Sequence, residues 1–86
     1  MSPEQCRAAR AWLNWSQHEL AAKAHVSDST IRDFEAGKRV PHPNNMQAIR
    51  AALEAARMRF QNAEDGTPLS VGQERPAGKK RAKQQR

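Results

Sequence analysis

Apolar side chains recur at helical spacing in four stretches of this 86-residue chain, and polar or proline-containing segments separate the stretches. The pattern predicts helices over about residues 3–13, 17–24 and 27–36, and a last helix from about residue 44 or 45 to about residue 56. The segment KRVPHPNN, before the last helix, is predicted to be a loop because of its prolines. The side chains predicted to share one core are Cys6, Ala9, Leu13, Leu20, Ala21, Ala24, Ile31, Phe34, Met46, Ile49, Leu53 and Ala56.

Short polar signatures mark where the first two helices begin. Ser2 and Gln5 stand three residues apart before the first apolar stretch, and Ser16 and Glu19 stand three apart before the second. In such a capping box the hydroxyl accepts a hydrogen bond from the backbone of the third helical residue, whose side chain bonds back to the backbone of the cap. Both signatures therefore predict helix N-termini.

The second and third predicted helices are joined by very few residues. Ala24, His25, Val26 and Ser27 form the junction, which predicts a sharp crossing between two short helices. His25 lies at the corner, where a left-handed backbone favours Gly and where His is one of the enriched alternatives. We interpret His25 as a mildly strained turn residue rather than a pH sensor or metal ligand, because the other histidines and Cys6 are not at ligand spacing with it.

The stretch SQHELAAKAHVSDSTIRDFEAGKRVPHPNN resembles the Cro/repressor-like helix-turn-helix family of bacterial and phage transcription regulators. The Ser-Gln-x-Glu-Leu-Ala start and the Ile-x-x-Phe-Glu-x-Gly end carry the likeness, although the family usually has Gly where this chain has His25. The resemblance covers about residues 4–56 and implies a domain that binds double-stranded DNA with helix 27–36 in the major groove. It also implies a homodimer, since such modules usually pair on a palindromic site.

The resemblance also indicates which residues would contact DNA. Gln17 at the start of the second helix, and Lys38 and Arg39 just after the third, are expected to contact phosphates. The outward face of the third helix is expected to meet base edges, unless it is an ordinary solvated surface. The complete candidate site is Gln17, Ser27, Asp28, Ser29, Arg32, Asp33, Lys38 and Arg39.

Two acidic residues on that face leave a second function open. Asp28 and Asp33 would repel phosphates, although a carboxylate can also accept a hydrogen bond from cytosine N4 or reject a wrong sequence. The alternative is that Asp28 serves only to stabilise its helix by a favourable interaction with the positive N-terminal end. The alternative function is a protein-interaction, antitoxin or adaptor module that uses the same fold with weak or no DNA binding.

Arg10 and Glu35 each interrupt an apolar helix face. Arg10 shares a face with Cys6 and Leu13, and Glu35 lies four residues after Ile31. A charge on each of two buried faces predicts that the faces meet in a partly buried structural ion pair, and many members of the family pair these positions. The alternative is two surface charges whose long side chains reach solvent.

The formal net charge of +6, from 15 basic and 9 acidic residues, is unevenly distributed. Residues 75–86 hold six basic residues and no acidic one, which leaves 9 of each sign in residues 1–74. The high pI that often indicates nucleic-acid binding therefore comes from the C-terminal segment. Residues 73–86 carry no large aliphatic or aromatic side chain and are predicted to be a disordered basic tail. This tail would bind phosphates of any sequence, or else act only as a solubilising appendage.

The predicted fold class is all-α. A four-helix helix-turn-helix domain is assigned to residues 1–60, a short extended or hairpin segment to 61–72, and the basic tail to 73–86. A domain of this size buries only about 60% of its unfolded surface, so association would help its stability. Residues 55–72 are the best candidate for the dimer surface.

The sequence favours a binding protein over an enzyme. It has no nucleophile paired with a base, no phosphate-binding glycine loop and no metal-ligand spacing, so no cofactor and no metal are expected. The single cysteine excludes an internal disulfide and suits the reducing cytoplasm, with nucleoid association when DNA is bound. No apolar run approaches the ~18 residues of a membrane span, and no secretory signal peptide is recognised, so no membrane partner is expected.

Overall fold

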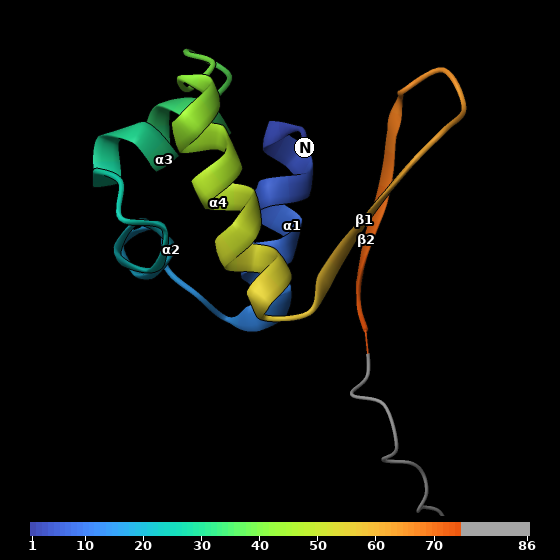
Figure 1. Cartoon of the computed structure of the whole chain (residues 1–86), viewed down its shortest axis with the longest axis horizontal. Helices are drawn as coiled ribbons and strands as arrows, with labels where there is room; N and C mark the ends of the chain where they lie inside the picture. Colours follow the sequence, from blue (N-terminus) through green and yellow to red (C-terminus); the bar gives the residue numbers. More distant parts are fainter. Residues whose placement is uncertain (75–86) are drawn as a thin grey trace, which may run out of the picture.

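The computed structural model describes residues 1–74, which form four helices followed by a β-hairpin (Figure 1). The last helix begins at Pro43 rather than Asn44 or Asn45, because proline suits the first helical position and His42 acts as the cap. The prediction of a disordered tail from residue 73 is wrong at Gln73, which is the last residue of the second strand and pairs with Met58. The rest of that prediction, for residues 75–86, lies outside the described part of the chain. The elements are α1 (Pro3–Leu13), α2 (Gln17–Ala24), α3 (Asp28–Glu35), α4 (Pro43–Ala55), β1 (Met58–Asn62) and β2 (Pro68–Gln73).

Both predicted capping boxes are confirmed. The Ser2 hydroxyl accepts a hydrogen bond from the Gln5 backbone at 3.0 Å, and the Gln5 side chain accepts one from the Ser2 backbone at 3.0 Å. Ser16 and Glu19 make the same reciprocal pair, also at 3.0 Å in each direction. These bonds fix where α1 and α2 begin, and hence which face of each helix meets the core.

The junction between α2 and α3 has the expected left-handed corner. His25 adopts φ 58° and ψ 41°, and the next backbone N–H, that of Val26, donates to the Ala21 carbonyl at 3.0 Å. This bond closes the end of α2 as a Schellman motif, so the chain can turn directly into the Ser27 cap of α3. Gly37, with φ 74°, ends α3 in the same way, and its Lys38 neighbour donates to the Asp33 carbonyl at 2.9 Å.

The core lies where the four helices meet and extends to the first residue of the hairpin. Most residues predicted to be buried are buried, but Leu13, Met46 and Ala56 are only partly covered because they lie at helix ends or at the rim. Met58, which was not assigned to the core, is completely buried. The buried apolar residues are Cys6, Ala9, Leu20, Ala21, Ala24, Ile31, Phe34, Ile49, Leu53 and Met58.

The hairpin corrects the all-α prediction. Strands β1 and β2 pair antiparallel, with Phe60 opposite Val71, and the hairpin packs against α1 (Figure 1). It begins at Met58, inside the range assigned to the helical domain, because Arg57 turns left-handed (φ 72°) at the end of α4 and leaves Met58 pointing into the core. The strands form because residues 58–61 alternate apolar and polar side chains, which covers one face and exposes the other.

Side chains of α1 bond the hairpin at its base and at the loop end of β1. The buried Gln5 amide donates to the Gln61 carbonyl at 3.3 Å and to Asn62 Oδ1 at 3.1 Å, and Trp12 Nε1 donates to Gln73 Oε1 at 3.1 Å. None of the helices in residues 1–74 has the length and apolar character needed to cross a membrane.

Candidate nucleic-acid interface

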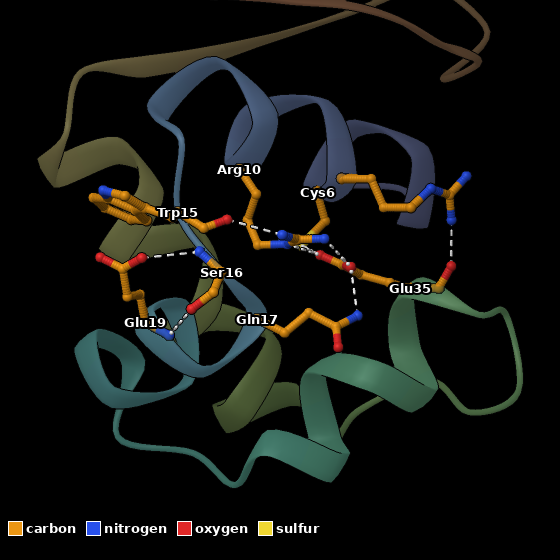
Figure 2. Close-up of polar contacts among 8 residues, drawn as sticks. Cys6, Arg10, Trp15, Ser16, Gln17, Glu19 and Glu35 are labelled. Atoms are coloured by element: carbon orange, nitrogen blue, oxygen red, sulfur yellow. Dashed lines mark hydrogen bonds and ion pairs between the residues drawn. The ribbon is translucent and has the colours of Figure 1, made fainter.

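The predicted ion pair between Arg10 and Glu35 is confirmed (Figure 2). Arg10 on α1 donates from Nε to Glu35 Oε2 and from Nη2 to Oε1, both at 2.8 Å, in a two-pronged contact with the end of α3. The Glu35 side chain is 2% exposed and that of Arg10 is 19% exposed, so the carboxylate is the more deeply enclosed partner. The pair is therefore part of the protein interior rather than a surface contact.

Two further side chains bond the same carboxylate. Gln17 at the start of α2 donates from Nε2 to Glu35 Oε1 at 3.0 Å, and the Cys6 thiol lies 3.2 Å from Oε2. Burial alone would raise the pKa of Glu35, but the hydrogen bonds from Arg10, Gln17 and Cys6 outweigh it and hold the pKa below its ordinary value. One buried anion thus joins α1, α2 and α3, as Figure 2 shows. We call Arg10, Gln17, Cys6 and Glu35 the Glu35 cluster.

The backbone around the Glu35 cluster is fixed by the two arginines of α1. Arg10 Nη1 donates to the Trp15 carbonyl at 2.9 Å, just before α2, and Arg7 Nη1 donates to the Glu35 carbonyl at the end of α3. Burial, followed by the hydrogen bond to Glu35, raises the pKa of Cys6, so this residue stays a neutral thiol. The relative position of α2 and α3 is therefore set by charged groups as well as by apolar packing.

Gln17 was predicted to contact DNA phosphate, and in the structure its amide faces inward. The side chain is half-buried and engaged with Glu35. The next residue, His18, is the exposed one: its Nδ1 lies 2.9 Å from Oδ2 and 3.1 Å from Oδ1 of Asp28 on α3. Sequence reasoning missed this contact, although His18 and Asp28 are oppositely chargeable residues at the starts of two adjoining helices.

The other predicted residues of α3 lie on or beside its exposed side. Ser27 serves as the cap, since its hydroxyl accepts from the Thr30 backbone at 3.2 Å and lies 3.1 Å from the Ser29 hydroxyl. Arg32 is exposed and its Nε lies 3.7 Å from Asp33 Oδ1. Lys38 and Arg39 are exposed just after the helix.

A hollow between α3 and the start of α4 brings part of this set together. It contains three of the predicted residues, Ser29, Asp33 and Arg39, and four that sequence reasoning did not assign. The unassigned residues are Thr30, Pro41, His42 and Asn45. Groups of three or more His, Cys, Asp or Glu side chains that could hold a metal ion are absent from residues 1–74.

The tight corner, the capped α3 and the exposed polar face of that helix define a helix-turn-helix domain. The model of the Helix-turn-helix family, of the Cro/C1 type, matches residues 7–55, from the first turns of α1 to the end of α4. The chain belongs to this family, which is one of DNA-binding regulators and is not typically enzymatic. The match ends before the hairpin. None of the curated proteins compared with the chain matches it.

Proposed function

We propose that this protein is a sequence-specific, repressor-like transcription regulator that reads the major groove of double-stranded DNA with residues 27–36. The observation that carries the proposal is the exposed polar face of α3, in a chain of a DNA-binding family, followed at once by exposed Lys38 and Arg39. In such a module the N-terminal part of this helix meets base edges while neighbouring basic groups meet phosphates.

Ser29 and Arg32 are the residues that we expect to meet bases. Arg32 is exposed, and a guanidinium can bond both major-groove acceptors of guanine. Ser29 opens onto the hollow beside α4, and its hydroxyl can donate or accept. The Glu35 cluster supports this role, because it joins both helices of the motif to α1 and so limits rocking of α3 in a groove.

Selection from a random duplex library at about 150 mM salt tests the proposal, because salt at that level suppresses purely electrostatic binding. An enriched palindrome is expected. Ser29→Ala or Arg32→Ala should weaken binding to the selected site by about 1–3 kcal/mol each. Arg50→Ala on α4 is the matched control, since it also removes one half-exposed arginine from an ion pair.

An NMR titration with the selected duplex locates the contact surface. The backbone N–H signals of Gln17 and of residues 27–39 are expected to shift most. Shifts that gather on α4 and spare α3 would show that residues 27–36 do not read the groove.

We also propose a homodimer in which residues 55–72 form the interface while residues 1–60 bind DNA. Leu69 on β2 is 63% exposed, and a hollow between β2 and α1 lies directly beside it, lined by Gln5, Ala8 and Val71 among others. Leu69→Ser should shift sedimentation toward the monomer, whereas Val40→Ser, at an exposed valine after α3, should not. A monomeric wild-type protein at high concentration would contradict the proposal.

The second candidate function is a protein-interaction, antitoxin or adaptor module. Asp28 and Asp33 on or beside the α3 face favour it, as does the formal neutrality of residues 1–74. The library selection separates the two functions, since a module of this kind would enrich no sequence. For the regulator we propose a cytoplasmic location, with nucleoid association through DNA.

A further inference from the structure

Two exposed side chains from different helices of the motif are bonded to each other on the side where DNA is proposed to bind. His18 Nδ1 approaches both carboxylate oxygens of Asp28, at 2.9 and 3.1 Å, and the two side chains are 78% and 57% exposed. A pair this exposed contributes little to folding. The stability of the pair therefore gives little reason for a histidine at position 18, although Asp28 by itself also suits the positive N-terminus of α3.

The neighbouring charged groups are engaged elsewhere. On α2, Glu19 closes its capping box and Lys23 lies over the Trp15 ring, 4.9 Å from its centroid. On α3, Arg32 lies near Asp33, and Glu35 is in the buried cluster. On α4, which also packs against α2, Arg50 pairs with Glu54 at 3.0 Å. Within the described residues, His18 forms its ion pair with Asp28.

The Gln17 side chain does not have the position that the sequence predicted for it, and the exposed side chain is that of His18, to which no role was assigned. The start of α2 is the part of the motif expected to cross the DNA backbone. The Gln17 amide at that start is occupied by Glu35, whereas His18, one residue later, is exposed. The imidazole is thus the side chain at this position that remains available for a phosphate.

We propose that His18 contacts a DNA phosphate and that Asp28 is the positioning residue that holds its ring for this contact. The inference rests on the DNA binding proposed above. Asp28 accepts a hydrogen bond from Nδ1, which fixes the ring and leaves Nε2 as the atom that faces the phosphate. The protonated ring has a donor at each nitrogen, one for the carboxylate and one for the phosphate.

This arrangement explains an acidic residue at the start of the recognition helix. A bare carboxylate beside the DNA backbone would repel phosphates, but a protonated ring next to it would offset its charge. Asp28 then acts through His18 and has no direct part in reading bases. Its effect on affinity must depend on whether His18 is present.

A double-mutant cycle on DNA affinity tests this dependence, with His18→Ala, Asp28→Ala and the double variant measured on the selected and a scrambled duplex. His18→Ala should weaken binding to both duplexes by about threefold to tenfold and flatten the slope of log affinity against log salt by about 0.9. Asp28→Ala should weaken binding when His18 is present. It should strengthen binding in the His18→Ala background, where the carboxylate faces phosphates alone.

Failure of the inference is distinguishable from failure of the proposed function. If Arg32→Ala abolishes specific binding while His18→Ala changes nothing, the inference alone is wrong. The inference is equally wrong if Asp28→Ala changes the preference among duplex sequences and has the same effect with and without His18. Asp28 would then read a base directly. A wild-type protein that binds no duplex overturns both. Melting temperatures close to that of the wild type would show that the variants fold.

Discussion

Replacing Arg10 with methionine removes the guanidinium that bonds both oxygens of the Glu35 carboxylate. Loss of one partner from a buried ion pair costs roughly 3–5 kcal/mol, because the other charge is left without compensation. Glu35 is 2% exposed and cannot turn to water, but Gln17 and Cys6 still bond it after the substitution. We therefore expect Arg10→Met to lower the free energy of unfolding by about 3 kcal/mol, the lower end of that range.

Replacing the other partner of the ion pair, Glu35, should cost less stability. Glu35→Leu leaves Arg10, whose side chain is already 19% exposed and can extend into solvent while keeping its apolar stem packed. A loss of about 1–2 kcal/mol is expected, close to that of one charge-assisted hydrogen bond. In the double variant neither charge is stranded, so its loss should be smaller than the sum of the two single losses by about 1–3 kcal/mol.

Thermal and urea unfolding of the four proteins measure this coupling. For a domain of this size 1 kcal/mol corresponds to about 4–8 °C in Tm, so Arg10→Met should lower Tm by about 12–24 °C. Arg50→Met is the control, because it breaks a half-exposed ion pair within α4 and should cost less than about 1 kcal/mol. Strictly additive losses at Arg10 and Glu35 would mean that the two charges do not stabilise each other, and the reasoning would fail.

The pH dependence of the same proteins gives a second check. In the wild type the pKa of Glu35 lies below its ordinary value, so its contribution to stability is present at neutral pH and is lost as pH falls through that pKa. Without Arg10, burial would dominate and raise the pKa, so the variant would instead gain stability on acidification. The stability deficit of Arg10→Met should therefore shrink between neutral pH and about pH 4. A deficit independent of pH would contradict this account.

Three further outcomes follow from single features. His25→Gly should raise stability by about 0.5–1 kcal/mol, because Gly adopts the left-handed corner without strain. The control Ala22→Gly, inside α2, should lower stability, and neither substitution should change DNA affinity. Gln17→Ala should lower the free energy of unfolding by about 1–2 kcal/mol through the lost bond to Glu35, and a change in DNA salt dependence with no loss of stability would contradict this. Deleting residues 75–86, whose six basic residues hold the positive excess, should weaken binding to all sequences alike and flatten the salt slope by about 0.9 per lost phosphate contact; equal slopes would leave the segment no part in binding.

The parts of the fold that the sequence predicted correctly are those set by contacts between near neighbours. Capping boxes, helical spacing and the short junction at His25 act over a few residues, so they can be recognised without knowing the fold. The Arg10–Glu35 pair is different, since 25 residues separate its members. It was predictable because each charge interrupts an apolar face and because the resemblance pairs these positions.

The hairpin and the exposed contacts could not be predicted with the same certainty. The strands have few apolar residues, and their formation depends on Met58 reaching the core and on Gln5 bonding Gln61 and Asn62. Such long-range contacts leave no local pattern. The inward turn of Gln17 was missed for the same reason, because only the folded chain brings its amide next to Glu35.

The structure divides the charged groups of the motif into two sets that should respond differently to mutation and to salt. The Glu35 cluster is enclosed, so changes there should alter folding and, through the orientation of α3, DNA binding together. His18, Asp28 and Arg32 are exposed, so changes there should alter binding with little effect on folding. Gln17 and His18 adjoin in sequence yet fall in different sets, because successive helical residues point about 100° apart. A comparison of these two neighbours therefore tests the division at a single turn of α2.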